Sequence, residues 1–322
     1  MRNDRPLISI VAPFFNESGN VFAFYQAIVS ELEHLSSCQF EVICVDDGSR
    51  DSTLQELLEI ISTDRRFRVI ELSRNFGKEA ALSAGLEVAQ GDAVITLDAD
   101  LQDPVSLIGQ LIETWQRLGV DVVLAKRASR YHDSPTKRIT AKAYYWFHNL
   151  LSPVKIPADV GDCRLMTRQV VQALALLPET QRFMKGLFAW VGFKTTVIEY
   201  DREIRRSGSS KFTWWRLWNF GIEGITSFST VPLRVWTYIG IVSACITAVF
   251  GLYVFLKTLM VGADVPGYAS VLVVILFFGS LQLIGLGILG EYVGRLYMEA
   301  KRRPPYLIRR LHEQSDVDVN SN

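Results

Sequence analysis

The chain of 322 residues is long enough for one or two domains with additional segments. Lys and Arg together number 34, as do Asp and Glu, so the net charge gives no argument for nucleic acid as a partner. The sequence is 49% hydrophobic with a mean hydropathy of +0.17, and the apolar excess lies in the last third. The four cysteines form no CxxC pair and the four histidines show no metal-ligand spacing, which favours a reduced, cytosol-facing catalytic part.

The first 125 residues alternate short apolar runs with amphipathic segments. The predicted strands are Leu7–Ala12, Glu41–Val45, Phe67–Leu72, Ala93–Leu97 and Asp121–Ala125. The predicted helices between them are Val21–Leu35, Thr53–Ile61, Glu79–Val88 and Val105–Leu118, with Asp51 or Ser52 as the N-cap of the second. Strands that alternate with helices predict an α/β fold with a mostly parallel sheet covered on both faces.

The segment Ala93–Pro104 ends its apolar run in two carboxylates, Asp98 and Asp100. Residues two apart in an extended segment project to the same side, so both carboxylates are offered together at the carboxyl end of a strand. Oxygen ligands of this kind suit Mg²⁺ or Mn²⁺ carrying the phosphates of a substrate, and ligands bind at this edge of an open α/β sheet. The alternative interpretation is a pair of solvated acids before a helix.

Three more strand ends carry polar loops. The first, Pro13-Phe-Phe-Asn-Glu17, lacks the glycine patterns of a dinucleotide fold and of a P-loop, which argues against dehydrogenases and P-loop ATPases. The second, Asp46-Asp-Gly-Ser49, suits ribose hydroxyls or a base N–H, or else is a simple Asp-Gly turn. The third, Ser73-Arg-Asn-Phe-Gly-Lys78, offers N–H groups and cations to an anion, or else is a solvated basic turn. Their combination favours a nucleotide-binding domain.

Basic residues follow the predicted strands. Arg127–Leu151 carries five cations and then an aromatic run, which suits a membrane surface or phosphate, or else a charged helix packed on the sheet. Gly161–Met166 places Asp162 and Arg164 just before a helical stretch, Gln169–Leu177, and Gly161–Arg164 is predicted to be a loop.

A predicted strand, Phe193–Ile204, and a flexible basic loop, Arg205–Lys211, come next. Apolar residues then recur at three- and four-residue steps in Lys211–Thr230, with three Trp within five residues. Indole rings favour the membrane–water boundary, so this segment is predicted to lie in the interface. The competing interpretation is a helix buried against the catalytic domain.

Two uncharged runs, Val235–Leu256 and Val265–Gly290, each exceed the roughly 20 residues that cross a bilayer as a helix. Basic residues follow the second run, which predicts a multi-pass inner-membrane protein with the catalytic domain and both termini in the cytoplasm. The spacing Gly290-Glu-Tyr-Val-Gly294 suits close helix packing and a homo-oligomer. The tail after Leu311 is polar and is predicted to be disordered.

Together these motifs resemble the GT-A family 2 glycosyltransferases. The resemblance rests on Pro13–Glu17, Val45–Ser49, Ser73–Lys78 and Asp98–Gln102. The Gly161–Arg164 loop and the two apolar runs narrow it to polyprenyl-phosphate glycosyltransferases, similar to dolichyl-phosphate mannose synthase and most similar to bactoprenol glucosyltransferases. It extends from Ile8 to Tyr306. It implies a GT-A nucleotide-sugar-binding domain with a mostly parallel sheet, followed by interface helices and two transmembrane helices.

The resemblance also implies roles for individual residues. Those expected to bind the donor nucleotide are Pro13, Phe14, Asn16, Glu17, Asp46, Asp47, Arg74, Asn75, Lys78 and Asp98. Asp98 and Asp100 are expected to hold the Mg²⁺ or Mn²⁺, with Gln102 in support. Those expected to receive the acceptor phosphate are Arg127, Arg138, Arg164, Arg205 and Lys211. Asp162 takes the position of a catalytic carboxylate, with Asp100 acting through the metal.

The implied reaction is inverting transfer of a sugar to undecaprenyl phosphate on the cytoplasmic leaflet, for cell-surface glycan modification. Glucose from UDP-glucose is favoured, and formamido-arabinose, mannose and GlcNAc are the alternatives. A divalent cation offsets the charge that builds on the departing nucleoside diphosphate. The attacking phosphate is already ionised at neutral pH, so Asp162 is interpreted as a positioning group ahead of a proton acceptor.

Two rival functions stay open. A processive polysaccharide synthase would share the loops, but Gln181-Arg-Phe-Met184 does not match its QxxRW motif and two spans offer little for a polymer channel. A non-catalytic membrane subunit would use the fold for binding alone, against which the intact acids of both strand ends argue. The expected domains are residues 1–210 (catalytic), 211–230 (juxtamembrane helix), 231–294 (transmembrane hairpin) and 295–322 (basic segment and tail).

Overall fold

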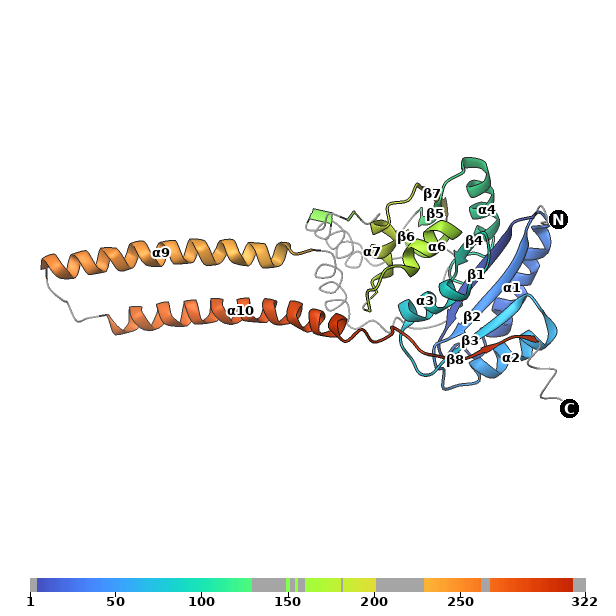
Figure 1. Ribbon diagram of the computed structural model, residues 1–322, viewed down its shortest axis with the longest axis horizontal. Coiled ribbons are helices and arrows are strands. Elements are labelled where there is room, and N and C mark those ends of the chain that lie inside the picture. Colours follow the sequence, from blue (N-terminus) through green and yellow to red (C-terminus); the bar gives the residue numbers. More distant parts are fainter. Residues whose placement is uncertain are drawn as a thin grey trace.

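The computed structural model describes residues 5–128, 149–150, 154–155, 160–180, 182–200, 229–261 and 267–314. An α/β domain carries a long two-helix hairpin that extends away from it (Figure 1). Several predictions lie outside the described residues: most of the basic segment after Arg127, the loop 205–211 and the interface helix up to residue 228.

One sheet runs through the α/β domain in the order β7-β5-β6-β4-β1-β2-β3-β8. Its strands are β1 (Leu7–Phe14), β2 (Gln39–Asp46), β3 (Phe67–Leu72), β4 (Ala93–Thr96), β5 (Val122–Arg127), β6 (Val160–Thr167), β7 (Thr195–Tyr200) and β8 (Ile308–His312). The central strands β4, β1, β2 and β3 are parallel, whereas β6 and β8 pair antiparallel with their neighbours. The predicted mostly parallel sheet is therefore confirmed.

Helices cover both faces of this sheet. They are α1 (Val21–His34), α2 (Thr53–Thr63), α3 (Lys78–Val88), α4 (Leu107–Leu118), α6 (Arg168–Ala175) and α7 (Met184–Trp190). In α1 the buried residues Val21, Phe24, Ile28 and Leu32 repeat at helical spacing, so one stripe of the helix packs on the sheet with α2 and α4. Helices α3, α6 and α7 cover the opposite face.

Strand β6 corrects the prediction of a loop at Gly161–Arg164. The segment carries Asp162 and Arg164, and charged residues are rare inside a central strand, which explains the prediction. Cys163 and Leu165 nevertheless fill one face of the core, and β6 pairs with both β4 and β5. The polar residues of this strand are therefore at an interior position of the sheet, beside the carboxyl end of β4.

Strand β8 lies within residues 295–322, which were predicted to be a basic segment and a disordered tail. The chain returns from the hairpin and pairs antiparallel with β3 at the edge of the sheet (Figure 1). Glu71 of β3 accepts hydrogen bonds from Arg309 at 2.9 Å and His312 at 3.1 Å, so one carboxylate of β3 binds two side chains of β8. His312, Glu313 and Gln314 are thus part of the domain, and residues 315–322 lie outside the described part.

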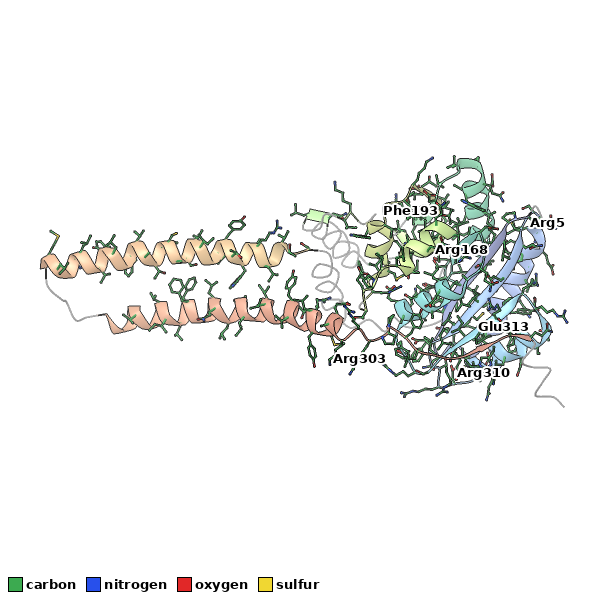
Figure 2. The ribbon with its side chains drawn as sticks, in the orientation of Figure 1. Arg5, Arg168, Phe193, Arg303, Arg310 and Glu313 are labelled. Atoms are coloured by element: carbon green, nitrogen blue, oxygen red, sulfur yellow. The ribbon has the colours of Figure 1, made fainter. Side chains whose placement is uncertain are left out.

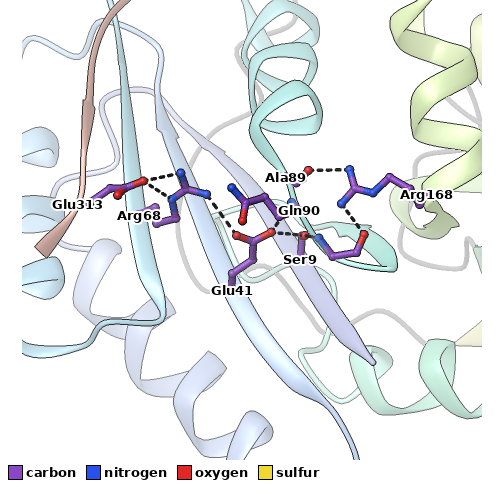
Figure 3. A network of polar contacts seen from close by, with 8 residues as sticks. Ser9, Glu41, Arg68, Ala89, Gln90, Arg168 and Glu313 are labelled. Carbon is purple, nitrogen blue, oxygen red and sulfur yellow. Dashed lines mark hydrogen bonds and ion pairs between the residues drawn. The ribbon is translucent and has the colours of Figure 1, made fainter. Parts of the chain in front are cut away.

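A polar network crosses the sheet at the edge where the parallel strands begin (Figure 3). Glu41 accepts hydrogen bonds from Ser9 Oγ at 2.5 Å and from the Gln90 N–H at 2.5 Å. Its second oxygen pairs with Arg68 at 3.3 Å, and Arg68 also binds Glu313 beyond β8. The Glu41 carboxylate therefore joins β2 to β1, to β3 and to the turn after α3, and Arg68 extends the network to the C-terminal segment.

Replacing Glu41 with Ala is expected to lower the free energy of unfolding by about 2–4 kcal/mol, because it leaves several polar groups without their partner in a largely buried place. Activity per folded molecule should be unchanged, since the network lies at the opposite edge of the sheet from Asp46 and Asp98. Chemical denaturation in detergent measures the first quantity. Glu33→Ala, on an exposed position of α1, is the matched control and should change the free energy by less than about 0.5 kcal/mol.

The hairpin consists of α9 (Val231–Val261) and α10 (Tyr268–Ala300). Both helices are long and apolar enough to cross a membrane, over Leu233–Val254 and Val274–Ala300, and their apolar side chains are almost entirely uncovered by the rest of the described protein. The second helix runs ten residues beyond the predicted end at Gly290. A Cβ atom at Gly285 would collide with the Trp236 indole, so the small residue allows the two helices to approach.

The base of the hairpin is joined to the α/β domain. The Glu299 carboxylate of α10 accepts the Thr180 N–H of the domain at 3.1 Å. Within the hairpin, Tyr292 of α10 donates to the carbonyl of Ser229, just before α9, at 2.7 Å. Arg303 follows directly at the junction, and Arg310 lies farther along on β8 (Figure 2). The last turn of α10 and β8 therefore hold the domain to the hairpin.

Candidate active site

The carboxyl ends of the parallel strands carry three loops that are tied to one another. The first loop, 13–19, is bound to the second, 46–52: the Asn16 N–H donates to Ser49 Oγ at 3.1 Å, and Asn16 Oδ1 accepts the Arg50 N–H at 2.9 Å. Asn16 has φ = 53°, a left-handed conformation that Asn adopts more readily than most residues. Asp51, one of the two predicted caps, accepts the Thr53 N–H at the start of α2.

The second loop is bound to the third, 73–78, by Asp47. Its carboxylate accepts the Phe76 N–H at 2.7 Å and the Gly77 N–H at 2.9 Å. Gly48, with φ = 65°, lies against the backbone of Arg74, where a Cβ atom would be 2.5 Å from the carbonyl carbon. The three loops therefore form one continuous wall, and its shape depends on this Asp-Gly pair.

This packing changes the roles of several residues that were predicted to bind the nucleotide. Asp46 and Asp47 are 1% and 2% exposed, and both carboxylate oxygens of Asp47 accept hydrogen bonds from the neighbouring loop. Phe14 is buried and packs edge-on against Phe24, with ring centroids 5.3 Å apart. Phe14 and Asp47 thus support the wall from behind, which corrects the expectation that both line the pocket. The exposed side of the wall carries Asn75 and Arg74, and the Arg74 guanidinium lies 4.1 Å from the centre of the Phe76 ring.

Two carboxylates come together where β4 meets β6. The antiparallel register pairs Thr96 with Arg164, which sets Asp98 opposite Asp162. Thr96 Oγ1 donates to the Asp162 carbonyl at 2.6 Å and fixes the two strands at this point. Lys78, from the start of α3, places Nζ 2.7 Å from Asp98 Oδ1 and 2.5 Å from Asp162 Oδ2. One ammonium group therefore bridges residues that are far apart in sequence.

A second cation, Lys185 of α7, lies 3.6 Å from the other oxygen of Asp162. No motif in the sequence marked it, because the contact depends on how α7 packs beside β6. Burial by itself raises the pKa of Asp162, but the charges of Lys78 and Lys185 outweigh this and hold the pKa well below its usual range. Asp162 is therefore a carboxylate at neutral pH and a weak proton acceptor.

Glu79, next to Lys78 on α3, belongs to the same cluster and was also missed. Burial raises its pKa to about 7, and the charge of Asp162 adds to the rise, while Lys78 and Lys185 oppose it. Near pH 7 the cluster therefore contains one carboxyl group, Glu79, that still binds a proton, and another, Asp162, that is ionised.

Arg164 was predicted to receive the acceptor phosphate. It is only 3% exposed, its guanidinium lies 3.9 Å from the Phe188 ring, and it donates to the Gly161 carbonyl at 3.0 Å. Such burial does not fit a contact with an incoming lipid phosphate. Arg164 instead lies behind Asp162, where its charge also favours the ionised carboxylate.

Among the other residues predicted for the acceptor, Arg127 is at the end of β5 beside Tyr200, with which it shares a hydrogen bond. Tyr200 in turn donates to the buried Asp103 at 2.5 Å. Arg138, Arg205 and Lys211 lie outside the described residues.

The metal-binding potential of the site rests on Asp98 and Asp100. Asp100 is exposed, and its carboxylate accepts the Gln102 N–H at 3.1 Å and the Gln102 side-chain amide. Leu101 between them has φ = 53°, an unusual conformation for a residue with a branched side chain. Within the described ranges no three His, Cys, Asp or Glu side chains form a metal site by themselves. Two carboxylates fit a divalent cation that takes its remaining ligands from substrate phosphates and water.

Comparison with known proteins identifies close relatives. Residues 9–175 match glycosyl transferase family 2. The prophage bactoprenol glucosyl transferase homolog of Escherichia coli K12 is 49% identical over 304 residues, which cover 94% of this chain and 99% of that protein. The SfII prophage-derived bactoprenol glucosyl transferase of Shigella flexneri is 50% identical, covering 95% and 98%. The putative glycosyltransferase CsbB of Bacillus subtilis is 42% identical, covering 94% and 91%.

Proposed function

The chain belongs to glycosyl transferase family 2, and from this premise we propose that it transfers glucose from UDP-glucose to undecaprenyl phosphate at the cytoplasmic face of the membrane. The observation that carries the proposal is the identity of about half with bactoprenol glucosyl transferases, because it extends over nearly the whole chain and so includes the hairpin as well as the catalytic domain. The glucose supplied on a lipid would serve the modification of a cell-surface glycan.

The wall of interlocked loops would bind the donor. Its exposed residues, Asn75 and Arg74, and the first-loop residues Asn16 and Glu17 would contact the nucleotide, while Asp47 keeps the loops in place. Asp98 and Asp100 would hold Mg²⁺ or Mn²⁺. Such a cation, when bound, offsets the negative charge on the departing nucleoside diphosphate.

Asp162 would act by position. Its lowered pKa makes it a poor base at neutral pH, and the attacking phosphate oxygen of the lipid is already ionised and needs none. Its carboxylate instead fixes the ammonium groups of Lys78 and Lys185 beside the reaction centre. The phosphate oxygen attacks the anomeric carbon as the bond to the nucleoside diphosphate breaks, which inverts the anomeric configuration.

The hairpin would span the membrane and bring the catalytic domain to the lipid. Four cations, Arg295, Lys301, Arg302 and Arg303, lie at the end of α10 that adjoins the domain. Positive residues at this end favour a cytoplasmic catalytic domain. The uncovered faces of both helices would also allow copies of the chain to associate through the hairpin.

The proposal predicts that purified protein in vesicles with undecaprenyl phosphate and Mg²⁺ or Mn²⁺ forms a lipid-extractable monosaccharide from UDP-glucose. A panel of labelled donors with glucose, GlcNAc, mannose and formamido-arabinose measures the preference. Greater transfer of another sugar would contradict the assignment of glucose. An insoluble polymer would favour a processive synthase, and failure to consume any donor would favour a non-catalytic subunit.

A further inference from the structure

Asp162 lies between two ammonium groups that come from different parts of the fold. Its Oδ2 atom is 2.5 Å from Lys78, which also holds Asp98 on the donor side of the site. Its Oδ1 atom is 3.6 Å from Lys185, on the opposite side of the carboxylate. A glycosyl transfer between two phosphates is favoured by a cation near each phosphate, because negative charge lies on both sides of the sugar. Among the described residues of this cluster, Lys78, Asp98 and Asp100 lie on the donor side.

The segment that carries Lys185 is attached to the hairpin. Just before α7, the Thr180 N–H donates to both carboxylate oxygens of Glu299, in the last turn of α10, at 3.1 Å. Arg182 holds the same segment by donating to the Leu177 carbonyl at 2.9 Å and to Ser83 Oγ at 3.2 Å. The position of Lys185 is therefore fixed relative to both the hairpin and α3.

The Lys185 side chain has the properties that an anion ligand needs. The side chain is 30% exposed and so is partly open to solvent, whereas Arg164 of the same cluster is only 3% exposed. The distance from Lys185 Nζ to Asp162 is 1.1 Å longer than the distance from Lys78 Nζ to the same carboxylate (3.6 Å against 2.5 Å). A phosphate oxygen that binds Lys185 therefore has a weaker ion pair to compete with. An ammonium group offers three donors, and Asp162 engages at most one of them.

We propose that Lys185 binds the phosphate of the lipid acceptor and that Asp162 holds its ammonium group in place for this contact. The inference rests on the proposed function and deepens it, since it assigns the acceptor subsite to a residue fixed to the membrane hairpin. Lys78 then serves the donor side and Lys185 the acceptor side of one carboxylate.

The test is the kinetics of Lys185→Gln and Lys185→Arg in the full-length protein reconstituted with undecaprenyl phosphate. For Lys185→Gln the acceptor KM should rise about 10- to 100-fold, because a charge-assisted hydrogen bond to phosphate is lost, while the donor KM stays within about twofold. Lys185→Arg keeps the positive charge and should recover most of the affinity. Lys194→Gln removes an exposed lysine nine residues farther along the chain and should change neither constant.

A binding measurement separates the phosphate contact from a general loss of structure. Quenching of Trp fluorescence in detergent should report weaker binding of undecaprenyl phosphate to Lys185→Gln, with equal binding of undecaprenol, which lacks the phosphate, and equal binding of UDP. An unchanged acceptor KM, or a donor KM that rises as much as the acceptor KM, would overturn the inference. So would a lower kcat with both KM values unchanged, since Lys185 would then act only on Asp162. Absence of transfer by the wild-type protein would instead refute the proposed function.

Discussion

Asp100→Asn is expected to lower glucose transfer to the lipid by on the order of a hundredfold to a thousandfold, because it removes one of the two carboxylates that would hold the divalent cation. Folding should be preserved. Asp100 is exposed, its side-chain bonds are to Gln102 two residues away, and the Asn oxygen can still accept the Gln102 N–H. The free energy of unfolding should therefore stay within about 0.5 kcal/mol of the wild-type value.

Two measurements together test this prediction. Lipid extraction of labelled glucose gives the rate, and electron paramagnetic resonance of Mn²⁺ in the presence of UDP reports metal binding without turnover. Glu113→Gln, which neutralises an exposed acid on α4, is the matched control and should leave both unchanged. Full activity of Asp100→Asn in purified vesicles would show that the acidic pair does not hold the metal.

The fold was predictable where local pattern and tertiary structure agree. The alternation of Val- and Ile-rich runs with amphipathic segments locates β1 to β5 and α1 to α4, because each strand is buried on both faces. Strands β6 and β8 were not found. β6 carries charges at an interior position. β8 is short and basic, and it is held by pairing with β3, including the contacts to Glu71, which is far away in sequence.

In the candidate site, too, contacts that depend on tertiary packing could not be predicted from the sequence. Motifs identify Lys78, Asp98 and Asp162, but the bridge from the Lys78 ammonium group to both carboxylates depends on the register of β4 against β6 and on the packing of α3. Lys185 has no motif of its own. Conversely, Phe14 and Asp47 stand inside a recognisable motif yet face the interior, since a loop needs groups to hold it as well as groups to bind a ligand.

Lys78→Met is expected to reduce transfer by about a hundredfold, since it removes the cation that joins the donor and acceptor sides of the site. Burial lowers the pKa of Lys78, but Asp98 and Asp162 together outweigh this and hold the pKa above its usual value, so the ammonium group is charged at pH 5 and at pH 8. Without it the two carboxylates face each other across the gap that Nζ had filled. The Lys78 side chain is 42% exposed, so solvent screens part of this repulsion and the loss of stability at pH 8 should be only about 1–2 kcal/mol.

The pH dependence of that loss identifies its cause. In the wild-type protein the lowered pKa of Asp162 contributes stability that is complete above the usual carboxyl range and is lost only as the pH falls through the folded-state value. In Lys78→Met the pKa values of Asp98 and Asp162 rise because their shared cation is gone, so protonation of one of these carboxylates on acidification relieves the repulsion. The stability deficit should therefore shrink between pH 8 and pH 5.

Chemical denaturation of the wild-type protein and the variant at both pH values measures this change. Lys126→Met breaks the exposed pair with Glu199 (2.9 Å) by the same substitution and should cost less than about 1 kcal/mol at either pH. Lys78→Arg retains the charge and should show no growth of the deficit toward pH 8. An equal deficit for Lys78→Met at pH 5 and pH 8 would mean that lost packing, and not the unshielded carboxylates, is responsible. The bridge would then be a structural contact and the link between the donor and acceptor sides would have to lie elsewhere in the cluster.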